Sequence, residues 1–346
     1  MSGLKLGFIG LGHITQNAHL APLSELVETG EVVFQAFCDV NEDTASEQAK
    51  KWGAKSVYTD YRAMFDSEDL DAVYVCIPPT LHTDAELIAA EKKIALFVEK
   101  PQTLNVQQAV QFANAISASG IVSQVGFMSR YYPSSEKVCE LLEGRTLRHA
   151  HVQLFYSGKH VRLWTSRMEL CGGSFVENTV HMVDLLRFFL GDINAVSAFY
   201  FDRKPGEGPE PINMPHVYDV NYQFSCGAVA NATTSRVLTN VSYQRRNVTV
   251  VADDALIDWS SQHVSLNGET VAKWEERANP FALQARAFVD AVKQGDPKAV
   301  RSPYAEALNS LTAVLGANAS AEAGGQRVIL DDMVRGDVVW VPKELP

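Results

Sequence analysis

The sequence has little of what marks an exported, membrane-bound or disulfide-stabilised protein. Its five cysteines are scattered without a CxxC pair, and no apolar run approaches the ~18 residues that a membrane span needs. The N-terminus, MSGLKLGFIGLG, lacks the charged start, long apolar stretch and cleavage site of a signal peptide. We therefore expect a cytoplasmic protein whose cysteines stay reduced.

Positive charge is also scarce. Lysine and arginine number 30 against 41 aspartates and glutamates, so the net charge is -11. Binding to nucleic acid or to anionic membranes needs a basic surface, and we expect neither partner. No HExxH motif and no low-complexity tract or internal repeat occurs, which argues against a zinc enzyme and against a repeat protein.

What the sequence does have is length and a large apolar fraction, 346 residues of which 46% are hydrophobic, which suggests two domains. In the first part, β-like apolar runs alternate with helical segments. Continuous rather than alternating apolar runs are typical of parallel strands covered on both faces, and predict a doubly wound α/β sheet. The predicted strands are residues 4–9, 32–39, 56–58, 72–78, 94–100 and 121–128.

The pattern changes near residue 128. A helix, a strand at 147–156 and a second helix at 174–191 precede many β-like runs between 193 and 274, which predicts an antiparallel sheet in an α+β domain. Residues 203–216 are rich in proline and glycine and predict a loop. Two late helices are expected near 280–295 and 303–323. We therefore divide the chain into domains 1–128 and 129–346.

The first predicted strand ends in a glycine turn that opens a helix. Gly10 and Gly12 let the backbone approach a pyrophosphate, and the helix N-terminus at His13 and Ile14 supplies N–H donors. A strict GxGxxG motif has a third glycine where Thr15 stands. The order of strand, glycine turn, helix and strand nevertheless favours a dinucleotide site over a simple turn.

The second strand ends at Asp39, where a carboxylate can accept both ribose hydroxyls of NAD and repel the extra phosphate of NADP. Residues 40–46, VNEDTAS, contain no Arg or Lys to bind that phosphate, so NAD is favoured over NADP. The alternative for Asp39 is a helix N-cap, although Asn41 and Thr44 are better placed for that.

Strands four and five also end in polar residues at the edge where doubly wound sheets bind ligands. We assign Ile77, Pro78, His82, Glu99 and Lys100 to the cofactor site. His82 has an alternative as an ordinary first-turn histidine. Lys100, fixed between a strand and a proline, has an alternative as the surface partner of Glu99.

The segment 174–191, SFVENTVHMVDLLRFFLG, is almost wholly apolar except for three titratable groups on one helical face, Glu177, His181 and Asp184. Polar groups on a buried helix imply either a structural network or a site. A metal site is a further alternative, but no third histidine supports it. Asp184 has a structural interpretation, as support or as a partner of Arg187 at i+3.

Arginines and a tryptophan precede this helix. Arg130, Arg162 and Arg167 suit hydroxyls or a carboxylate, and Trp164 suits the apolar face of a sugar or the nicotinamide. We predict Arg130 and Arg167 at the substrate and Trp164 at the cofactor. Their alternative is surface or interface packing.

Several motifs together resemble the Gfo/Idh/MocA oxidoreductase family over nearly the full length. They are GFIGLGHI, CD after strand two, IPPTLH, EKP, VGFMSRYYP and GGSFVENTVH. The resemblance implies a Rossmann domain followed by a domain with a large, mostly antiparallel open sheet, through which members form homodimers or homotetramers. It also implies a carbohydrate or cyclitol substrate.

The resemblance places the lysine of EKP and the acid and histidine of the GG segment at the reaction centre, which here are Lys100, Glu177 and His181. Glu177 replaces the more usual aspartate. In oxidation of a carbinol, His181 would accept the hydroxyl proton, Lys100 would stabilise the alkoxide, and Glu177 would orient the imidazole or bind a neighbouring hydroxyl. The family also includes redox-neutral glycoside cleavage through transient oxidation and non-catalytic sugar sensors, so these remain alternatives to an NAD-dependent dehydrogenase.

Overall fold

The computed structural model describes residues 3–157, 164–204, 207, 212–238, 241 and 244–342. Contacts between Cα atoms divide the chain into two compact units. The first unit comprises residues 1–102, 109–128 and 279–307, and the second comprises 103–108, 129–278 and 308–346. Residues 279–307, which a single boundary after 128 assigns to the second domain, therefore group with the first unit.

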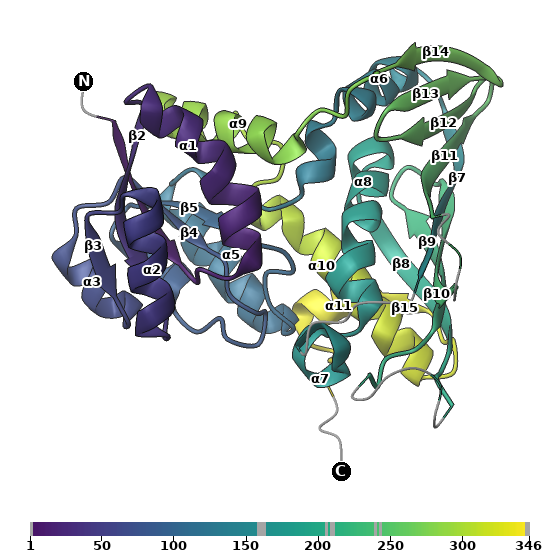
Figure 1. Ribbon diagram of the computed structural model, residues 1–346. Helices are drawn as coiled ribbons and strands as arrows, with labels where there is room; N and C mark the ends of the chain where they lie inside the picture. Colours follow the sequence, from purple (N-terminus) through teal and green to yellow (C-terminus); the bar gives the residue numbers. More distant parts are fainter. Residues whose placement is uncertain are drawn as a thin grey trace. The chain divides into compact units, whose positions relative to one another are not determined.

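The first unit contains a sheet of six parallel strands in the order β3-β2-β1-β4-β5-β6 (Figure 1). The chain starts in the middle of this sheet and builds outward on both sides, so the predicted doubly wound architecture is confirmed. Ligands bind such sheets at the carboxyl ends of the strands beside the central switch point. The strands are β1 Leu4–Ile9, β2 Val32–Cys38, β3 Ser56–Tyr58, β4 Ala72–Val75, β5 Ala95–Val98 and β6 Ser123–Val125.

The apolar runs form strands here because helices cover both faces of the sheet. Phe8 and Tyr74 are fully buried in a core cluster that includes Leu23 of α1 and Phe288 of α9, two helices that lie side by side (Figure 1). On the other face, Met64 of α3 reaches the strand at Gly7. The helices are η1 Thr15–Leu20, α1 Ala21–Glu28, α2 Glu42–Trp52, α3 Tyr61–Ser67, α4 Ala85–Glu91, α5 Val106–Ser119 and α9 Pro280–Gln294.

The second unit contains a nine-stranded sheet in the order β14-β13-β12-β11-β7-β10-β9-β8-β15. β7 and β10 pair in parallel and the other described pairs are antiparallel, so the predicted α+β architecture is confirmed. The strands are β7 Leu147–Ser157, β8 Ile193–Phe201, β9 Val217–Phe224, β10 Val229–Leu238, β11 Arg245–Ala252, β12 Leu256–Ser260, β13 His263–Leu266, β14 Glu269–Lys273 and β15 Val328–Ile329.

One face of this sheet packs against helices, with α8 on β7 and α6 along β12 to β14 (Figure 1). Even-numbered residues of the central strands, among them Leu154 and Thr234, point to that face and are buried. The helical segments are η2 Met128–Tyr131, α6 Pro133–Leu142, η3 Trp164–Ser166, α7 Met168–Cys171, η4 Phe175–Thr179, α8 Val180–Leu190, α10 Tyr304–Glu322 and α11 Leu330–Arg335. Among the described helices, none combines the length and the apolar character that crossing a membrane requires.

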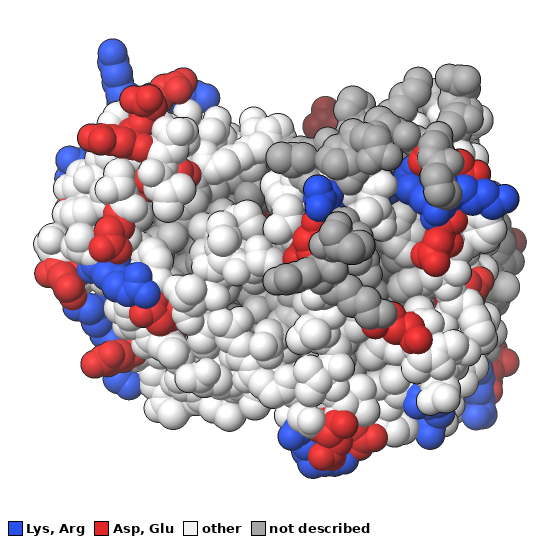
Figure 2. All heavy atoms as spheres, turned by 90° about the horizontal axis from the view of Figure 1, so that it is seen from below, with Lys and Arg blue, Asp and Glu red and all other residues white. Residues whose placement is uncertain are grey.

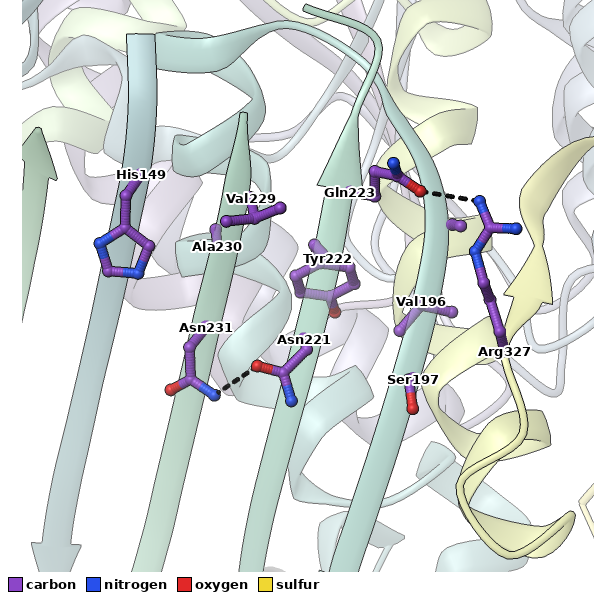
Figure 3. A pocket seen from close by; sticks show the side chains of 11 residues that line it. His149, Val196, Ser197, Asn221, Tyr222, Gln223, Val229, Ala230, Asn231 and Arg327 are labelled. Atoms are coloured by element: carbon purple, nitrogen blue, oxygen red, sulfur yellow. Dashed lines mark hydrogen bonds between the residues drawn. The ribbon is translucent and has the colours of Figure 1, made fainter. Parts of the chain in front are cut away.

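The opposite face of the nine-stranded sheet holds a shallow hollow of about 400 Å³ over β8, β9 and β10 (Figure 3). Asn231 Nδ2 donates to Asn221 Oδ1 across two strands at 3.1 Å, and Arg327 Nη2 donates to Gln223 Oε1 at 2.7 Å. None of the predicted site residues lines this hollow. It belongs to the open surface of the sheet.

Candidate active site

The glycine turn after β1 leaves its backbone accessible. Gly10 has a φ of +86°, and a Cβ built there lies 2.5 Å from the carbonyl oxygen of Cys76. Glycine alone tolerates this left-handed and crowded position. A Cβ on Gly12 would meet nothing within 4 Å, and both Gly12 and His13 are exposed. A phosphate group can therefore approach the backbone at the start of the helix, where unpaired N–H groups favour an anion.

The helix after this turn begins at His13 and passes through the π-helical stretch η1 before it continues as α1. Thr15, which replaces the third glycine of the motif, is fully buried, and its Oγ1 donates to the carbonyl of Gly10 at 2.7 Å. The threonine thus adds a hydrogen bond within the turn. Ile14 lies beside it, half-buried.

Asp39 is half-buried and holds the glycine turn. Its Oδ2 accepts a hydrogen bond from the Leu11 N–H at 2.8 Å, and its Oδ1 accepts from the Asn41 N–H at 3.0 Å. Asn41, not Asp39, caps α2, because its side chain accepts from the Thr44 N–H at 2.9 Å. A carboxylate offers about four acceptor positions, so Asp39 retains capacity for ribose hydroxyls.

The segment after β4 places two of its three predicted cofactor residues within reach of solvent. Ile77 and Pro78 are half-buried. His82 is only 3% exposed, and its Nδ1 contacts the fully buried Glu86 Oε1 one helical turn further on. The imidazole thus turns inward to an acidic partner, which fits the alternative of an ordinary first-turn histidine. The cofactor role of His82 stays a prediction.

The EKP segment after β5 separates its two charged residues. Lys100 is half-buried, whereas Glu99 is 5% exposed and its Oε1 lies 2.7 Å from His19 Nε2. Glu99 Oε2 accepts from the backbone N–H of Lys100 at 3.1 Å, and a Cβ on Gly126 would meet the Glu99 carboxyl at 2.9 Å. The carboxylate of Glu99 is thus buried, where it binds the backbone N–H of Lys100 and the side chain of His19, and it does not lie at the surface.

The helix 174–191 is not a regular α-helix. Gly172 and Gly173, both with positive φ, lead into the π-helical stretch η4, which α8 continues. Glu177 and His181 are half-buried, but Asp184 is fully buried, so the three groups do not share one accessible face as the regular 3.6-residue period predicts. Short π-helical stretches occur often at functional sites.

Asp184 and Arg130 form a buried ion pair inside the second unit. Arg130 Nε donates to Asp184 Oδ2 at 2.7 Å and its Nη2 donates to Oδ1 at 2.6 Å, and Ser310 Oγ adds a bond to Oδ1 at 2.8 Å. Arg187 Nη1 lies 4.0 Å from the same carboxylate. Arg130 is only 2% exposed, which fits a supporting role for the helix, and the predicted contact of Arg130 with a substrate stays a prediction.

Trp164 and Arg167 lie in the segment before this helix and are both half-buried. Arg167 Nη2 pairs with Glu169 Oε1 at 2.5 Å, and Glu169 Oε2 also accepts from Asn213. The pairing ties Arg167 to its own short helix. Arg162 lies outside the described residues.

A group of side chains that the sequence did not indicate lies on the helix-covered face of the nine-stranded sheet. Ser174 Oγ is 2.9 Å from the Tyr156 hydroxyl and accepts from Arg236 Nη1 at 3.0 Å, while the Ser174 N–H donates to the Tyr218 hydroxyl at 3.1 Å. The Arg236 guanidinium lies over the Tyr156 ring, 5.0 Å from its centroid. We call Tyr156, Ser174, Tyr218 and Arg236 the sheet-face cluster.

This cluster is electrostatically coupled to the site helix. Burial raises the pKa of the Tyr156 phenol, the positive charge of Arg236 opposes that rise, and the charge of Glu177 adds to it. Glu177 therefore lies within electrostatic reach of the cluster. The strands that carry the cluster are far apart in sequence, and the signal available for them was the even-numbered alternation of β7, β9 and β10.

A metal site was the third alternative for the acidic and imidazole groups of the helix 174–191. In the described part of the chain, no three His, Cys, Asp or Glu side chains gather closely enough to hold a metal ion.

A parallel doubly wound sheet with a glycine turn and an acidic second strand defines a dinucleotide-binding domain. A family model described as an oxidoreductase family with an NAD-binding Rossmann fold matches residues 4–127, and a model of the GFO/IDH/MocA C-terminal domain matches residues 144–257. The protein is thus of the nicotinamide-dependent oxidoreductase class. The chain belongs to the Gfo/Idh/MocA family, which confirms the resemblance of its motifs.

Two curated relatives match most of the chain. A myo-inositol 2-dehydrogenase of Thermotoga maritima is 24% identical over 86% of this chain and 90% of its own length. A D-xylose 1-dehydrogenase (NADP(+)) of Haloferax volcanii is 24% identical over 86% of this chain and 92% of its own length. The relatives' names therefore include both a cyclitol and a sugar, and one specifies NADP.

Solved structures share the fold. A levoglucosan dehydrogenase in complex with NADH and levoglucosan aligns with a TM-score of 0.82 at 19% identity, over 95% of this chain and 100% of its own. An oxidoreductase from Agrobacterium radiobacter in complex with NAD+, L-tartaric acid and magnesium aligns with a TM-score of 0.81 at 18% identity, over 96% and 100%.

Proposed function

We propose that the protein is an NAD-dependent dehydrogenase that oxidises a secondary carbinol of a sugar, sugar acid or cyclitol. One observation carries the proposal: on a helix whose Asp184 and Arg187 are buried, Glu177 and His181 alone among the titratable groups remain half-buried and reachable. Titratable groups kept accessible in an otherwise apolar helix are the usual arrangement of a site.

The first unit would hold the cofactor through Gly10, Gly12, His13 and Ile14 at the pyrophosphate and Asp39 at a ribose. The open backbone at Gly12 and the remaining acceptor capacity of Asp39 support this fit. Ile77 and Pro78 would border the site, and Trp164 is a further candidate from the second unit. The bound dinucleotide supplies the hydride acceptor for oxidation of the carbinol. NAD rather than NADP is favoured by the negative charge of Asp39.

The remaining chemistry belongs to the side chains. His181, as a neutral imidazole, would accept the hydroxyl proton. Lys100, whose backbone is fixed through Glu99 and His19, would donate to the carbinol oxygen and favour its negative charge. Glu177 would orient the imidazole or bind a neighbouring hydroxyl, and Arg167 stays a candidate for substrate contact.

Relatives named for inositol, xylose and levoglucosan support a polyol substrate. Two alternatives use the same site differently. Redox-neutral glycoside cleavage would pass through a transient oxidation and regenerate the cofactor, and a sensor would bind without turnover. The accessible Glu177 and His181 pair favours an enzyme over a sensor, because binding alone needs no proton acceptor.

A substrate screen tests the proposal. The pure protein is incubated with a panel of sugars, sugar acids and cyclitols, with NAD and NADP in parallel, and nicotinamide absorbance at 340 nm is followed. We expect net NADH formation with at least one polyol. Glycoside cleavage without net NADH would favour the redox-neutral alternative, and binding without any turnover across the panel would favour the sensor.

We also propose that the protein forms a homodimer or homotetramer through the open face of the nine-stranded sheet. Phe199 and Phe201 of β8 are 62% and 54% exposed on this unit, and large exposed aromatic side chains favour an interface. Sedimentation velocity measures the assembly. A protein that stays monomeric at micromolar concentration would contradict this proposal without affecting the proposed reaction.

A further inference from the structure

Four arginines of the second unit act on one another in two pairs, Arg203 with Arg236 and Arg246 with Arg277, although the protein as a whole is acidic. Acidic and basic side chains are otherwise interspersed on the face seen in Figure 2, and the net charge is -11. In the second unit, Arg236 belongs to the cluster, Arg203 follows β8, Arg246 lies on β11, and Arg277 donates to the Tyr132 hydroxyl. This local excess of positive charge differs from the composition of the chain and calls for a physical reason.

The arginines are linked electrostatically. Burial lowers the pKa of Arg203, and the positive charge of Arg236 lowers it further. Burial likewise lowers the pKa of Arg246, and the charge of Arg277 contributes to the decrease. Both Arg236 and Arg246 act on the Tyr156 phenol, which lies on the strand between theirs. The like charges are therefore close enough to oppose one another.

Register places two of these arginines on the helix-covered face. Arg246 pairs with Leu154 across β11 and β7, and Leu154 is buried on that face. Arg236 lies on the same face because its guanidinium covers Tyr156, two residues after Leu154, and donates to Ser174. Arg245, one residue before Arg246, points to the opposite face, is exposed, and donates to Gln153 Oε1 at 3.0 Å.

The hydrogen-bond partners of Arg246 in the described part of the chain are neutral. Its Nη2 donates to Ser129 Oγ and its Nε to Met182 Sδ, both at 3.3 Å, and no described carboxylate pairs with it. A half-buried guanidinium without a carboxylate is costly unless an anion joins it. The charge of Glu177 acts on Tyr156, that of Glu169 acts on Cys171 together with Arg236, and that of Glu207 acts on Arg203, but none of these carboxylates acts on Arg246.

We propose that the substrate is an anionic polyol, whose carboxylate or phosphate binds the guanidinium groups of Arg236 and Arg246 beside Tyr156 and Ser174. The planar fork of a guanidinium matches both groups through paired N–H donors. The inference rests on the proposed function, because it names the substrate class of the same site. It assigns the specificity for charge to residues of the sheet and leaves the proton transfer to the site helix.

The test compares sugars that share a skeleton and differ only at C6, namely D-glucose, D-glucuronate and D-glucose 6-phosphate, together with the matching galactose and mannose series. Equilibrium binding to the protein with NADH is measured by calorimetry, and turnover is measured with NAD. We expect an anionic member of at least one series to bind tenfold or more tightly than its neutral counterpart. The two anions distinguish a carboxylate from a phosphate.

Variants then locate the effect. Arg236→Gln and Arg246→Gln are each expected to weaken binding of the preferred anion by about 10- to 100-fold, the range for a lost charged hydrogen bond, and binding of the neutral sugar less than threefold. Arg236→Lys keeps the charge without the fork and should lie between. Arg245→Gln, on the other face of the same strand, is the matched control and should change neither affinity more than twofold.

Anions that bind no more tightly than their neutral counterparts in every series would overturn the inference. So would arginine variants that weaken neutral and anionic ligands equally, because that result indicates a structural role. Preferential binding of an anion without any turnover would leave this inference standing and contradict the proposed dehydrogenase. The two proposals therefore fail in different measurements.

Discussion

The two helices that carry the candidate site residues begin alike and serve different purposes. In the first unit, Gly10 and Gly12 precede a helix with the π-helical stretch η1, and in the second unit Gly172 and Gly173 precede one with η4. The first helix offers backbone N–H groups at an exposed turn, while the second presents side chains. A short sequence motif is enough to predict the start of the first helix. The surroundings of the second helix depend on strands that are distant in sequence.

Each unit also has a buried pair of polar side chains close to its candidate site residues. In the first unit, His19 and Glu99 pair beneath Lys100. In the second, Arg130 and Asp184 pair beneath the helix of His181. Each pair joins residues more than 50 positions apart, so in both units the accessible groups are supported by buried polar pairs from elsewhere in the fold.

The largest expected effect is a loss of turnover without a loss of cofactor binding. His181→Ala removes the proposed proton acceptor and should lower kcat by about 10²- to 10⁴-fold, the usual contribution of a general base. The dissociation constant for NADH, measured by fluorescence titration, should stay within threefold. Unchanged turnover would rule out His181 as the base. A parallel loss of NADH affinity would mean that the second unit does not serve chemistry alone.

The second largest effect is expected on stability, when the buried ion pair of the second unit is broken. Asp184→Asn removes the carboxylate charge that Arg130 binds in a site only 2% exposed and should lower the free energy of unfolding by about 3–5 kcal/mol. Urea denaturation followed by circular dichroism measures it. The double variant Arg130→Met with Asp184→Leu removes both charges and should recover most of the loss. If the double variant is no more stable than the single one, the ion pair is not the cause.

The smallest effect concerns the choice of cofactor in the first unit. Asp39→Asn keeps an acceptor for the Leu11 N–H but removes the charge that repels a 2′-phosphate, and should raise kcat/KM for NADP relative to NAD about tenfold, a change near 1.4 kcal/mol. Asp39→Ala also removes the acceptor. Its additional decrease in kcat/KM with both cofactors therefore measures how much Asp39 supports the glycine turn. If the ratio of kcat/KM for NADP to kcat/KM for NAD is unchanged in Asp39→Asn, the charge of Asp39 does not select between the two cofactors.

Much of the fold follows from short-range patterns. The continuous apolar runs predicted the six parallel strands, and the change near residue 128 predicted the second, mostly antiparallel sheet. The late helices lie at Pro280–Gln294 and Tyr304–Glu322, close to the predicted ranges. The grouping of α9 with the first unit was not predicted, because its apolar side chains carry no sign of which sheet they will cover.

The candidate site was harder to predict from the sequence than the fold. The glycine turn and the end of β2 carry local signals, but the inward turn of His82 to Glu86 and the burial of Glu99 against His19 depend on packing. A regular helical period predicted Asp184 on the face of Glu177 and His181, but its full burial depends on the ion pair with Arg130, which the period does not show. Buried polar partners from separate strands leave no pattern in a single sequence.

The alternation along β10 and β11 has a practical meaning for engineering. Arg245 and Arg246 are neighbours in sequence and face opposite sides of one sheet, so inserting or deleting a single residue in β11 would exchange the two surfaces at once. Substitutions at even-numbered positions can instead redesign the ligand side while the outer side stays as it is. A mutant library built on alternate codons of these strands would vary the proposed ligand side and leave the proposed assembly face unchanged.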